Sequence, residues 1–344
     1  MEPLSQSEEL LIRELFENSI NSEKVNVNKL ESVNKLSGDV STRKYYRLFC
    51  AGKNFVVCID SPENLSKEDY NFLTTQEVFK ASNVPVPEIF DVRIDRGYVL
   101  MEDLGDETLL TRNSAIPSLE LEEKNYKEII DILIKIHEID NVKHSNHSIA
   151  RCAFDEEKFL WETNFTNQNL IKKYLGNDNT SVVKDIEQEF RPIIQKILSL
   201  KKVPVHRDFH SRNIMYFDKK FFVIDFQDAR QGPIQYDIVS LLEDAYYKIQ
   251  RVNRYSIQKY FYESITSAKL FSGSFDEFIY GYELVACQRI YKAIGTFCYI
   301  LAERNDPRYV RYVHSCFERL KEIMFRHEDL ASLRKRLSSV YYEY

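Results

Sequence analysis

One short stretch of the chain holds acidic and amide side chains at a spacing that suits phosphoryl transfer. His206-Arg207-Asp208 follows an apolar run that ends at Val205, and Asn213 comes five residues after the aspartate. A strand-like run, Phe221 to Ile224, then leads to Asp225. Transfer of a phosphoryl group needs a carboxylate at the attacking hydroxyl, oxygen ligands for Mg²⁺ and donors around the phosphates.

Each of these three side chains therefore receives a predicted role. Asp208 is the candidate catalytic residue, because it can accept the proton of a substrate hydroxyl or orient that hydroxyl. Asn213 and Asp225 are the candidate metal ligands, since hard oxygen atoms suit Mg²⁺. A hairpin between them is expected to bring Asp225 beside the other two. Taken singly, each residue has a capping role as its alternative, but H-R-D-x₄-N followed by a strand-borne D-F favours a kinase site.

Two regions of different periodicity must position these residues. Short alternating runs bounded by turns predict a small antiparallel sheet, with strands at 45–50, 55–59, 89–94 and 98–101. Apolar residues at helical spacing predict helices at 69–82, 126–139, 155–175 and 182–200, and again from 236 onward. The sequence thus predicts an α+β, two-lobed fold. A small β-rich nucleotide-binding lobe spans 1–103, and a larger α-helical lobe for catalysis and substrate binding spans 104–344.

The front lobe offers two candidate contacts for ATP. The loop from Ser37 to Thr42 lies between two predicted strands and could donate backbone N–H groups to phosphates. The connector from Glu102 to Leu104 could offer backbone groups to adenine. A plain hairpin loop and a plain linker are the alternatives. The candidate nucleotide-binding residues are Gly38, Ser41, Thr42, Arg43, Glu102 and Leu104.

Composition and charge exclude several other classes of protein. The net charge of −6 is spread along the chain, so no basic face for nucleic acid is expected. The six cysteines form no CxxC pair, which indicates reduced thiols and not a disulfide framework or a zinc site. No signal peptide and no apolar stretch of about 20 residues is found, so we expect a cytoplasmic protein without membrane contact.

At several stretches the chain resembles the aminoglycoside phosphotransferase-like kinases, a branch of the protein-kinase fold. Within them it is similar to the bacterial sugar kinases that phosphorylate N-acetylmuramate and N-acetylglucosamine at C1. D-F-Q-D-A and H-S-R-N are more specific to this branch than H-R-D alone. The resemblance is carried by Gly38 to Arg47, Val205 to Met215, Val223 to Ala229 and Gly232 to Leu242, and more weakly by Gln288 to Phe297.

The resemblance implies ATP and Mg²⁺ as cofactors, a small-molecule sugar as substrate and a role in recycling cell-wall sugars. It also implies that Asp237 is a buried brace between a helix and the catalytic loop, with a helix N-cap as the alternative. One departure concerns the third front-lobe strand, which lacks the lysine that most kinases of this fold carry there. Arg43, Lys44 and Arg47 are the candidates to replace that cation.

Three residues are predicted to contact the acceptor. Arg212, just before Asn213, suits an anionic or polyhydroxylated acceptor, with a surface salt bridge as its alternative. Gln227 replaces the usual glycine after D-F, and it either bonds the sugar or holds the loop. Glu162 is a candidate for a sugar-hydroxyl contact, with a solvated helix carboxylate as its alternative. His137 is expected to be a packed core histidine.

Other functions remain open at the level of sequence. A kinase of this fold for an aminoglycoside, choline, homoserine or another sugar is the first alternative. A nucleotide-binding pseudokinase, suggested by the missing lysine, is the second, although Asp208, Asn213 and Asp225 are all in place.

Overall fold

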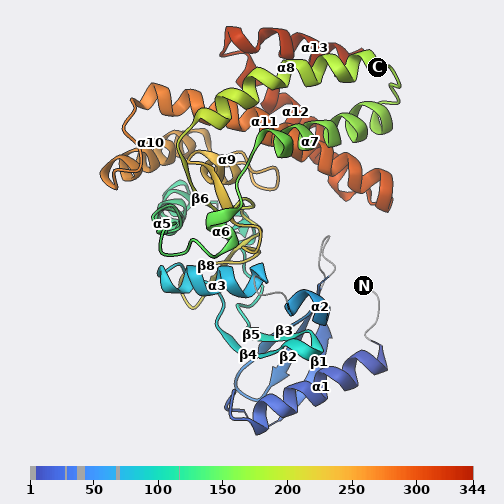
Figure 1. Ribbon diagram of the computed structural model, residues 1–344, viewed down its shortest axis with the longest axis vertical. Coiled ribbons are helices and arrows are strands. Elements are labelled where there is room, and N and C mark those ends of the chain that lie inside the picture. The colour runs from blue at the N-terminus through green and yellow to red at the C-terminus, as the bar shows by residue number, and fades with distance from the viewer. Residues whose placement is uncertain (1–4, 28, 37–42, 67–69, 116, 344) are drawn as a thin grey trace. The chain divides into compact units, whose positions relative to one another are not determined.

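The computed structural model describes residues 5–27, 29–36, 43–66, 70–115 and 117–343 (Figure 1). The chain forms two compact units, each with its own packed interior. One unit comprises Met1–Glu107 and Met215–Gln227, and the other comprises Thr108–Ile214 and Asp228–Tyr344. The predicted boundary between lobes after Asp103 stays a prediction.

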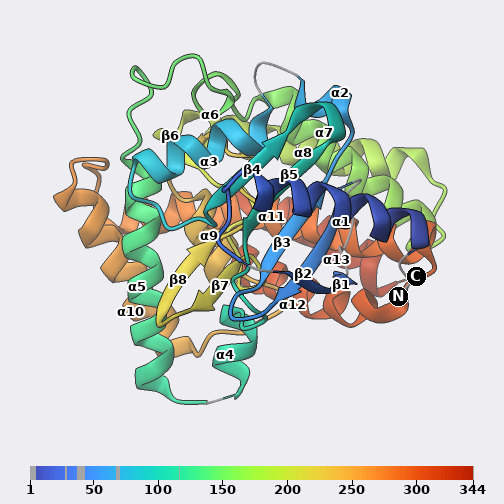
Figure 2. The same cartoon turned by 90° about the horizontal axis from the view of Figure 1, so that it is seen from below.

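The first unit is built on a five-stranded antiparallel sheet in the order β1-β2-β3-β5-β4. Its strands are β1 (Leu30–Lys35), β2 (Lys44–Cys50), β3 (Phe55–Ile59), β4 (Ile89–Arg93) and β5 (Tyr98–Glu102). Helix α1 (Gln6–Asn21) begins at a capping box formed by Ser5 and Glu8. Figure 2 shows α1, in dark blue, lying over the strands. Its Ile12 and Phe16 pack with alternate strand residues such as Phe55, which forms the core of this unit.

Smaller elements complete the first unit. They are α2 (Pro62–Leu65), α3 (Asn71–Ala81), η1 (Ile94–Arg96) and the hairpin of β7 (Ile214–Phe217) and β8 (Lys220–Val223). The N–H of Val223 donates to the carbonyl of Pro85 at 2.8 Å. Phe226 stacks on Phe72 of α3, with ring centroids 5.3 Å apart. The hairpin that leads to Asp225 is therefore packed against α3.

The second unit is mostly helical. Its helices are α4 (Leu109–Ala115), α5 (Leu119–His137), α6 (Ser148–Arg151), α7 (Glu156–Thr166), the π-helix η2 (Asn167–Tyr174), α8 (Thr180–Ser199), α9 (Tyr236–Leu242), α10 (Arg251–Ser267), α11 (Phe275–Arg304), η3 (Pro307–Tyr309), α12 (Val310–Met324), η4 (Glu328–Leu330) and α13 (Ala331–Tyr342). Two short strands, β6 (Lys202–Val205) and β9 (Arg230–Pro233), pair antiparallel. The long helix α11 contacts α7, η2, α8, α9 and α12, so it is the central helix of this unit (Figure 1).

Some sequence-based bounds need correction. Helix α5 begins at Leu119, after the cap Ser118, and not near 126. The polar residues of its first turns concealed this start, because they lack the apolar spacing of a helix. One of them, Glu122, is nevertheless buried, and the amide of Asn253 donates to its carboxylate at 2.7 Å. The helix predicted at 155–175 is present, but it changes from α to π geometry after Thr166. In the described part of the chain, no helix combines the length and the apolar character needed to cross a bilayer.

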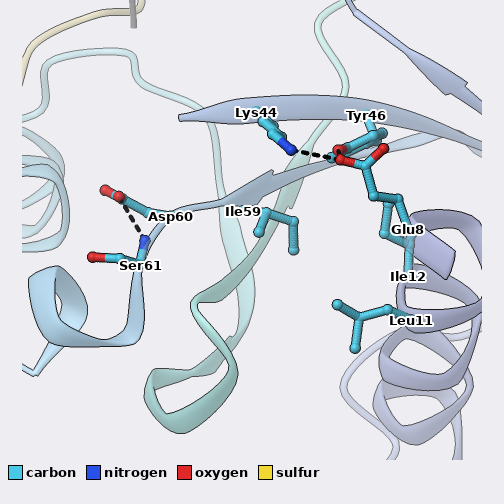
Figure 3. A pocket seen from close by; sticks show the side chains of 8 residues that line it. All are labelled: Glu8, Leu11, Ile12, Lys44, Tyr46, Ile59, Asp60 and Ser61. Atoms are coloured by element: carbon cyan, nitrogen blue, oxygen red, sulfur yellow. Dashed lines mark hydrogen bonds and ion pairs between the residues drawn. The ribbon is translucent and has the colours of Figure 1, made fainter. Parts of the chain in front are cut away.

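A pocket of about 330 Å³ lies between α1 and the sheet of the first unit (Figure 3). Its lining combines apolar side chains of α1 with the ends of β2 and β3. An ion pair between Lys44 and Glu8, with their charged atoms 2.6 Å apart, crosses the α1 side of this pocket. Lys44 therefore faces α1. Its pairing with Glu8 weakens the case for Lys44 as the cation that binds phosphate.

Candidate active site

The catalytic loop, residues 206–213, is held by a buried carboxylate. Asp237, in the first turn of α9, accepts the backbone N–H of His206 at 2.6 Å and that of Arg207 at 2.9 Å. Burial raises the pKa of Asp237 to about 7, while these two donors act to lower it. The predicted brace is confirmed. The N-cap alternative is wrong, because Gln235 occupies the N-cap of α9.

The loop also fixes Asn213 relative to Asp208. The amide nitrogen of Asn213 donates to the backbone carbonyl of Asp208 at 2.9 Å, and its backbone N–H donates to the carbonyl of His210 at 2.9 Å. The N–H of Ser211 donates to the carboxylate of Asp244 at 2.9 Å. The amide nitrogen of Asn213 is thus directed to the loop. Its amide oxygen is the atom that suits a hard cation such as Mg²⁺.

Helix α11 brings two cations to the carboxylate of Asp208. Nζ of Lys292 lies 3.9 Å from Oδ1, and a terminal nitrogen of Arg289 lies 4.0 Å from the same oxygen. Burial raises the pKa of Asp208, but Lys292, Arg207 and Arg289 outweigh it and hold that pKa well below its usual range. Asp208 therefore stays ionised, and it can accept a hydrogen bond from a hydroxyl while remaining a weak base.

Glu162 of α7 belongs to the same cluster. Its side chain is only 1% exposed, so the alternative of a solvated carboxylate is wrong. Gln288 donates to Oε2 at 2.8 Å, and Nζ of Lys292 lies 3.9 Å from Oε1. Lys292 is thus within ion-pairing distance of both Glu162 and Asp208. The structure brings a predicted substrate residue and the predicted catalytic residue together around one lysine.

Arg212 lies in aromatic surroundings. Its guanidinium is 4.6 Å from the ring centroid of Tyr246, and one of its nitrogens lies 3.4 Å from the hydroxyl of Tyr309. The ring of Phe297 stacks on that of Tyr309 at 5.9 Å. The contact between Arg212 and the ring of Tyr246 is a cation–π contact, which holds the guanidinium in place. The predicted contact between Arg212 and the acceptor stays a prediction.

Asp225 and Gln227 lie in the first unit, directly after β8. Asp225 has a left-handed backbone, with φ at 64°, and its side chain is exposed. The amide of Gln227 donates to Oδ1 of Asp225 at 2.8 Å. Of the two roles predicted for Gln227, this bond supports holding the loop. Its contact with a sugar stays a prediction.

Arg47, one of three candidate cations, binds the connector that follows β5. Its Nε lies 2.8 Å from the carboxylate of Asp103, and its terminal nitrogens donate to Asp106 at 2.8 Å and to the carbonyl of Gly105 at 2.9 Å. A guanidinium with its fork filled by two carboxylates and a carbonyl is held in one orientation. These contacts of Arg47 hold the connector in place, and we call them the latch.

Arg43 lies at the start of β2. Its Nε is 3.8 Å from the carboxylate of Asp60, and its guanidinium is 5.6 Å from the ring centroid of Phe72. The ring of Phe72 belongs to α3, whereas Lys44 contacts α1. Arg43 adjoins the predicted phosphate loop directly in sequence.

The other predicted nucleotide residues divide into two groups. Gly38, Ser41 and Thr42 lie outside the described residues. Glu102 ends β5, where its backbone N–H donates to the carbonyl of Glu88 at 2.8 Å. Leu104 is buried in the connector. The contacts of these residues with a nucleotide stay predictions.

Comparison with known proteins decides the family. The phosphotransferase enzyme family matches residues 32–268, which is more than half of the chain and includes the whole catalytic loop and Asp225. The chain belongs to this family. The resemblance predicted from the sequence is therefore confirmed.

Two curated relatives of this phosphotransferase match along most of their length. The N-acetylmuramate/N-acetylglucosamine kinase of Neisseria meningitidis serogroup B is 30% identical over 300 residues, which cover 86% of this chain and 87% of that protein. The protein of the same name from Pseudomonas putida is 28% identical over 315 residues, which cover 90% and 88%. The phosphotransferase is thus similar to sugar kinases along nearly its whole fold.

Solved structures confirm the predicted two-lobed, protein-kinase-like fold. The choline kinase LicA from Streptococcus pneumoniae superposes with a TM-score of 0.60 at 13% identity, covering 92% of this chain and 99% of that chain. An ADP-bound aminoglycoside phosphotransferase superposes with a TM-score of 0.56 at 15% identity, covering 95% and 98%. The family match and the kinases among its relatives show that the phosphotransferase is an ATP-dependent small-molecule kinase, as predicted. This finding counts against the pseudokinase alternative.

Reasoning from the sequence missed Arg289 and Lys292 of the phosphotransferase. They lie three residues apart on a helix, so they share one face with Gln288, four residues before the lysine. Periodicity indicates such a face but does not indicate which element it contacts. The only signal was the weaker family likeness of this stretch.

Proposed function

We propose that this kinase transfers the γ-phosphoryl group of ATP to the anomeric C1 hydroxyl of N-acetylmuramate or N-acetylglucosamine. The similarity to the Neisseria and Pseudomonas kinases, whose names state these two acceptors, supports this choice. The likeness to choline and aminoglycoside kinases extends to the fold alone. The acceptor must therefore be argued from the residues around Asp208.

The cationic surroundings of Asp208 carry the choice of acceptor class. Lys292 and Arg289 lie within 4.0 Å of its carboxylate. Choline and aminoglycosides are cations, so these two side chains would repel them. N-acetylglucosamine is neutral and N-acetylmuramate carries a carboxylate, so neither suffers this repulsion. The anomeric hydroxyl is also more acidic than an ordinary alcohol, which suits a weak base.

In the proposed reaction, Asp208 accepts a hydrogen bond and then the proton from the C1 hydroxyl. The C1 oxygen forms its bond to the γ-phosphorus as the bond from that phosphorus to ADP breaks, and ADP leaves. Asn213 and Asp225 are the proposed oxygen ligands of Mg²⁺, an ion that neutralises phosphate charge when bound. Asp237 keeps the loop in the conformation that presents Asp208.

On the nucleotide side, Arg43 is the proposed substitute for the lysine that β3 lacks. Lys44 and Arg47 are already engaged, Lys44 by Glu8 of α1 and Arg47 by the connector. Arg43 adjoins the loop proposed to cover the phosphates, and its Nε lies 3.8 Å from the carboxylate of Asp60. Its place next to that loop supports the choice.

The remaining assignments follow the same scheme. Backbone groups of Gly38, Ser41 and Thr42 are proposed to bind phosphate, and those between Glu102 and Leu104 to bind adenine. Glu162 is the proposed partner of a sugar hydroxyl. Arg212 and Gln227 are proposed to bind the acceptor as well.

A panel of acceptors tests the proposed function. The purified protein is supplied with ATP, Mg²⁺ and one acceptor at a time: N-acetylmuramate, N-acetylglucosamine, choline, an aminoglycoside or homoserine. ADP release should appear with the two N-acetyl sugars and not with the cationic acceptors. Turnover on choline or an aminoglycoside, together with silence on both sugars, would contradict the proposal.

A further inference from the structure

Buried polar atoms without hydrogen-bond partners gather near Asp208. Among the residues that the structure describes, Oε1 of Glu162, Oε1 of Gln288, Nε of Arg289 and the hydroxyl of Tyr236 have no hydrogen-bond partner. Glu162, Gln288 and Tyr236 are all more than nine-tenths buried. Buried polar groups are nearly always paired, so a group of unpaired ones indicates a place for ligand or water oxygens.

Lys292 lies beside Asp208 and Glu162. Its ammonium is 3.9 Å from Asp208 and 3.9 Å from Glu162, which is too far for a direct hydrogen bond. Burial lowers the pKa of Lys292, but Tyr236, Glu162 and Asp208 outweigh it and raise that pKa above its ordinary value. The side chain is therefore a charged donor that lacks a close acceptor in either carboxylate.

The gap between Lys292 and Asp208 matches one oxygen atom. Hydrogen bonds of about 2.8 Å to the ammonium and about 2.7 Å to the carboxylate would span it, with an angle at the oxygen close to a right angle. The equal gap to Glu162 fits a second oxygen in the same way. A hydroxyl of the acceptor satisfies the first gap, and a second hydroxyl or a water molecule satisfies the other, whereas a quaternary ammonium group satisfies neither.

We propose that Lys292 is a further catalytic residue, which donates a hydrogen bond to the acceptor oxygen that attacks the γ-phosphorus. The inference rests on the proposed function and adds a residue to it. Lys292 keeps its proton throughout: the hydroxyl proton goes to Asp208, the oxygen–phosphorus bond forms and the bond to ADP breaks. Its charge stabilises the negative charge that develops on the attacking oxygen. Glu162 and Gln288 bind a further polar group of the acceptor.

Close packing of two helices sets this geometry. A Cβ on Gly295 would lie 2.6 Å from Cα of Thr166, so α11 and the end of α7 approach backbone to backbone. The hydroxyl of Thr166 also donates to the carbonyl of Tyr291 at 3.2 Å. These contacts fix α11 one turn from Lys292, opposite the helix that carries Glu162. The lysine therefore sits on a rigid support.

The test pairs a lysine variant with an acceptor that lacks the reacting hydroxyl. Wild-type protein, Lys292→Met and the exposed control Lys173→Met are compared in kcat/KM for N-acetylglucosamine at saturating ATP. Calorimetry then measures the binding of N-acetylglucosamine and of its 1-deoxy analogue to each protein. If Lys292→Met fails to fold, Lys292→Gln replaces it in both measurements.

The inference predicts a specific pair of changes. In Lys292→Met, kcat/KM falls by about 10²-fold or more. In wild type, both Lys292 and Asp208 bond the C1 hydroxyl, so the preference for the sugar over its 1-deoxy analogue falls in this variant by about tenfold, the share of one charge-assisted bond. Lys173→Met behaves as wild type. A Lys292 variant with kcat/KM within about threefold of wild type, or one that keeps the full preference, would overturn the inference.

Failure of the proposed function gives a different result. If wild-type protein phosphorylates another alcohol and neither N-acetyl sugar, the proposed acceptor is wrong, and the same two measurements on that alcohol and its deoxy analogue decide the role of Lys292. Transfer to no alcohol at all would overturn both.

Discussion

The backbone N–H of Arg207 donates to the carboxylate of Asp237 at 2.9 Å, one residue ahead of Asp208. The other oxygen of that carboxylate accepts the N–H of His206. Arg207 has a left-handed backbone, with φ at 82°, which residues with a side chain rarely adopt. The two bonds to Asp237 stabilise this turn, and the turn sets the direction in which the side chain of Asp208 leaves the loop.

Replacement of Asp237 should therefore damage both stability and catalysis. Asp237→Ala leaves two buried N–H groups without an acceptor, so the free energy of unfolding should fall by about 2–4 kcal/mol in urea titrations. The exposed control Asp178→Ala should stay within about 0.5 kcal/mol of wild type. Equal losses in the two variants would contradict the brace.

Gly295 should resist substitution more strongly than Gly281 in the same helix. A Cβ at Gly295 meets the Cα of Thr166, whereas a Cβ at Gly281 meets mainly the ends of Gln235 and Leu200. Gly295→Ala should lower the free energy of unfolding by about 1–3 kcal/mol, because the two backbones must separate. It should also lower kcat, since Lys292 moves with α11. Thermal unfolding of the two alanine variants makes the comparison, and similar stabilities would contradict the packing argument.

The sequence was sufficient to predict those parts of the site whose residues lie close together along the chain. H-R-D-x₄-N places Asp208 and Asn213 on one loop, and the bond from the amide of Asn213 to the carbonyl of Asp208 is local. Strands β2 to β5 of the first unit were likewise predictable, because they are short runs rich in β-branched and aromatic residues and bounded by turns. Strand β9 was not, since Arg230-Gln231-Gly232-Pro233 has the composition of a turn and becomes a strand only by pairing with β6.

Tertiary contacts account for the parts of the site that were missed. Glu162 had the sequence context of an exposed helix residue, but α11 covers it and supplies Gln288 and Lys292. Likewise, the sequence did not indicate which of the three candidate cations binds the nucleotide phosphates. Their different partners, Asp60, Glu8 and Asp103, separated them.

The latch formed by Arg47 should affect the affinity for ATP. Lysine has a single charged nitrogen and cannot bind Asp103, Asp106 and the carbonyl of Gly105 as the guanidinium does. Arg47→Lys should raise the KM for ATP by about tenfold, the equivalent of about 1.4 kcal/mol, with little change in the KM for the sugar. Arg96→Lys, at an exposed arginine 3.4 Å from Glu14, is the control. An unchanged KM for ATP would remove the connector from the nucleotide site.

His137 should make the fold sensitive to acid. It is buried, as predicted, and burial lowers its pKa to about 3. The unfolded chain binds this proton near the ordinary pKa, so stability is lost as the pH falls below that value, by about 2 kcal/mol between pH 7 and pH 5. His137→Leu should lose about 2 kcal/mol less over this interval. Urea titrations at the two pH values measure it, and parallel losses would contradict the assignment.

The position of the phosphate on the product shows whether the anomeric hydroxyl is the acceptor and whether Asp208 acts on it. Wild-type protein is incubated with ATP, Mg²⁺ and N-acetylmuramate or N-acetylglucosamine, and phosphorus–proton couplings in the NMR spectrum locate the new ester. We expect a phosphate on the anomeric oxygen, formed about 10²- to 10⁴-fold more slowly by Asp208→Asn. A phosphate on any other hydroxyl of the sugar, or formation of the anomeric ester by Asp208→Asn at the wild-type rate, would contradict it.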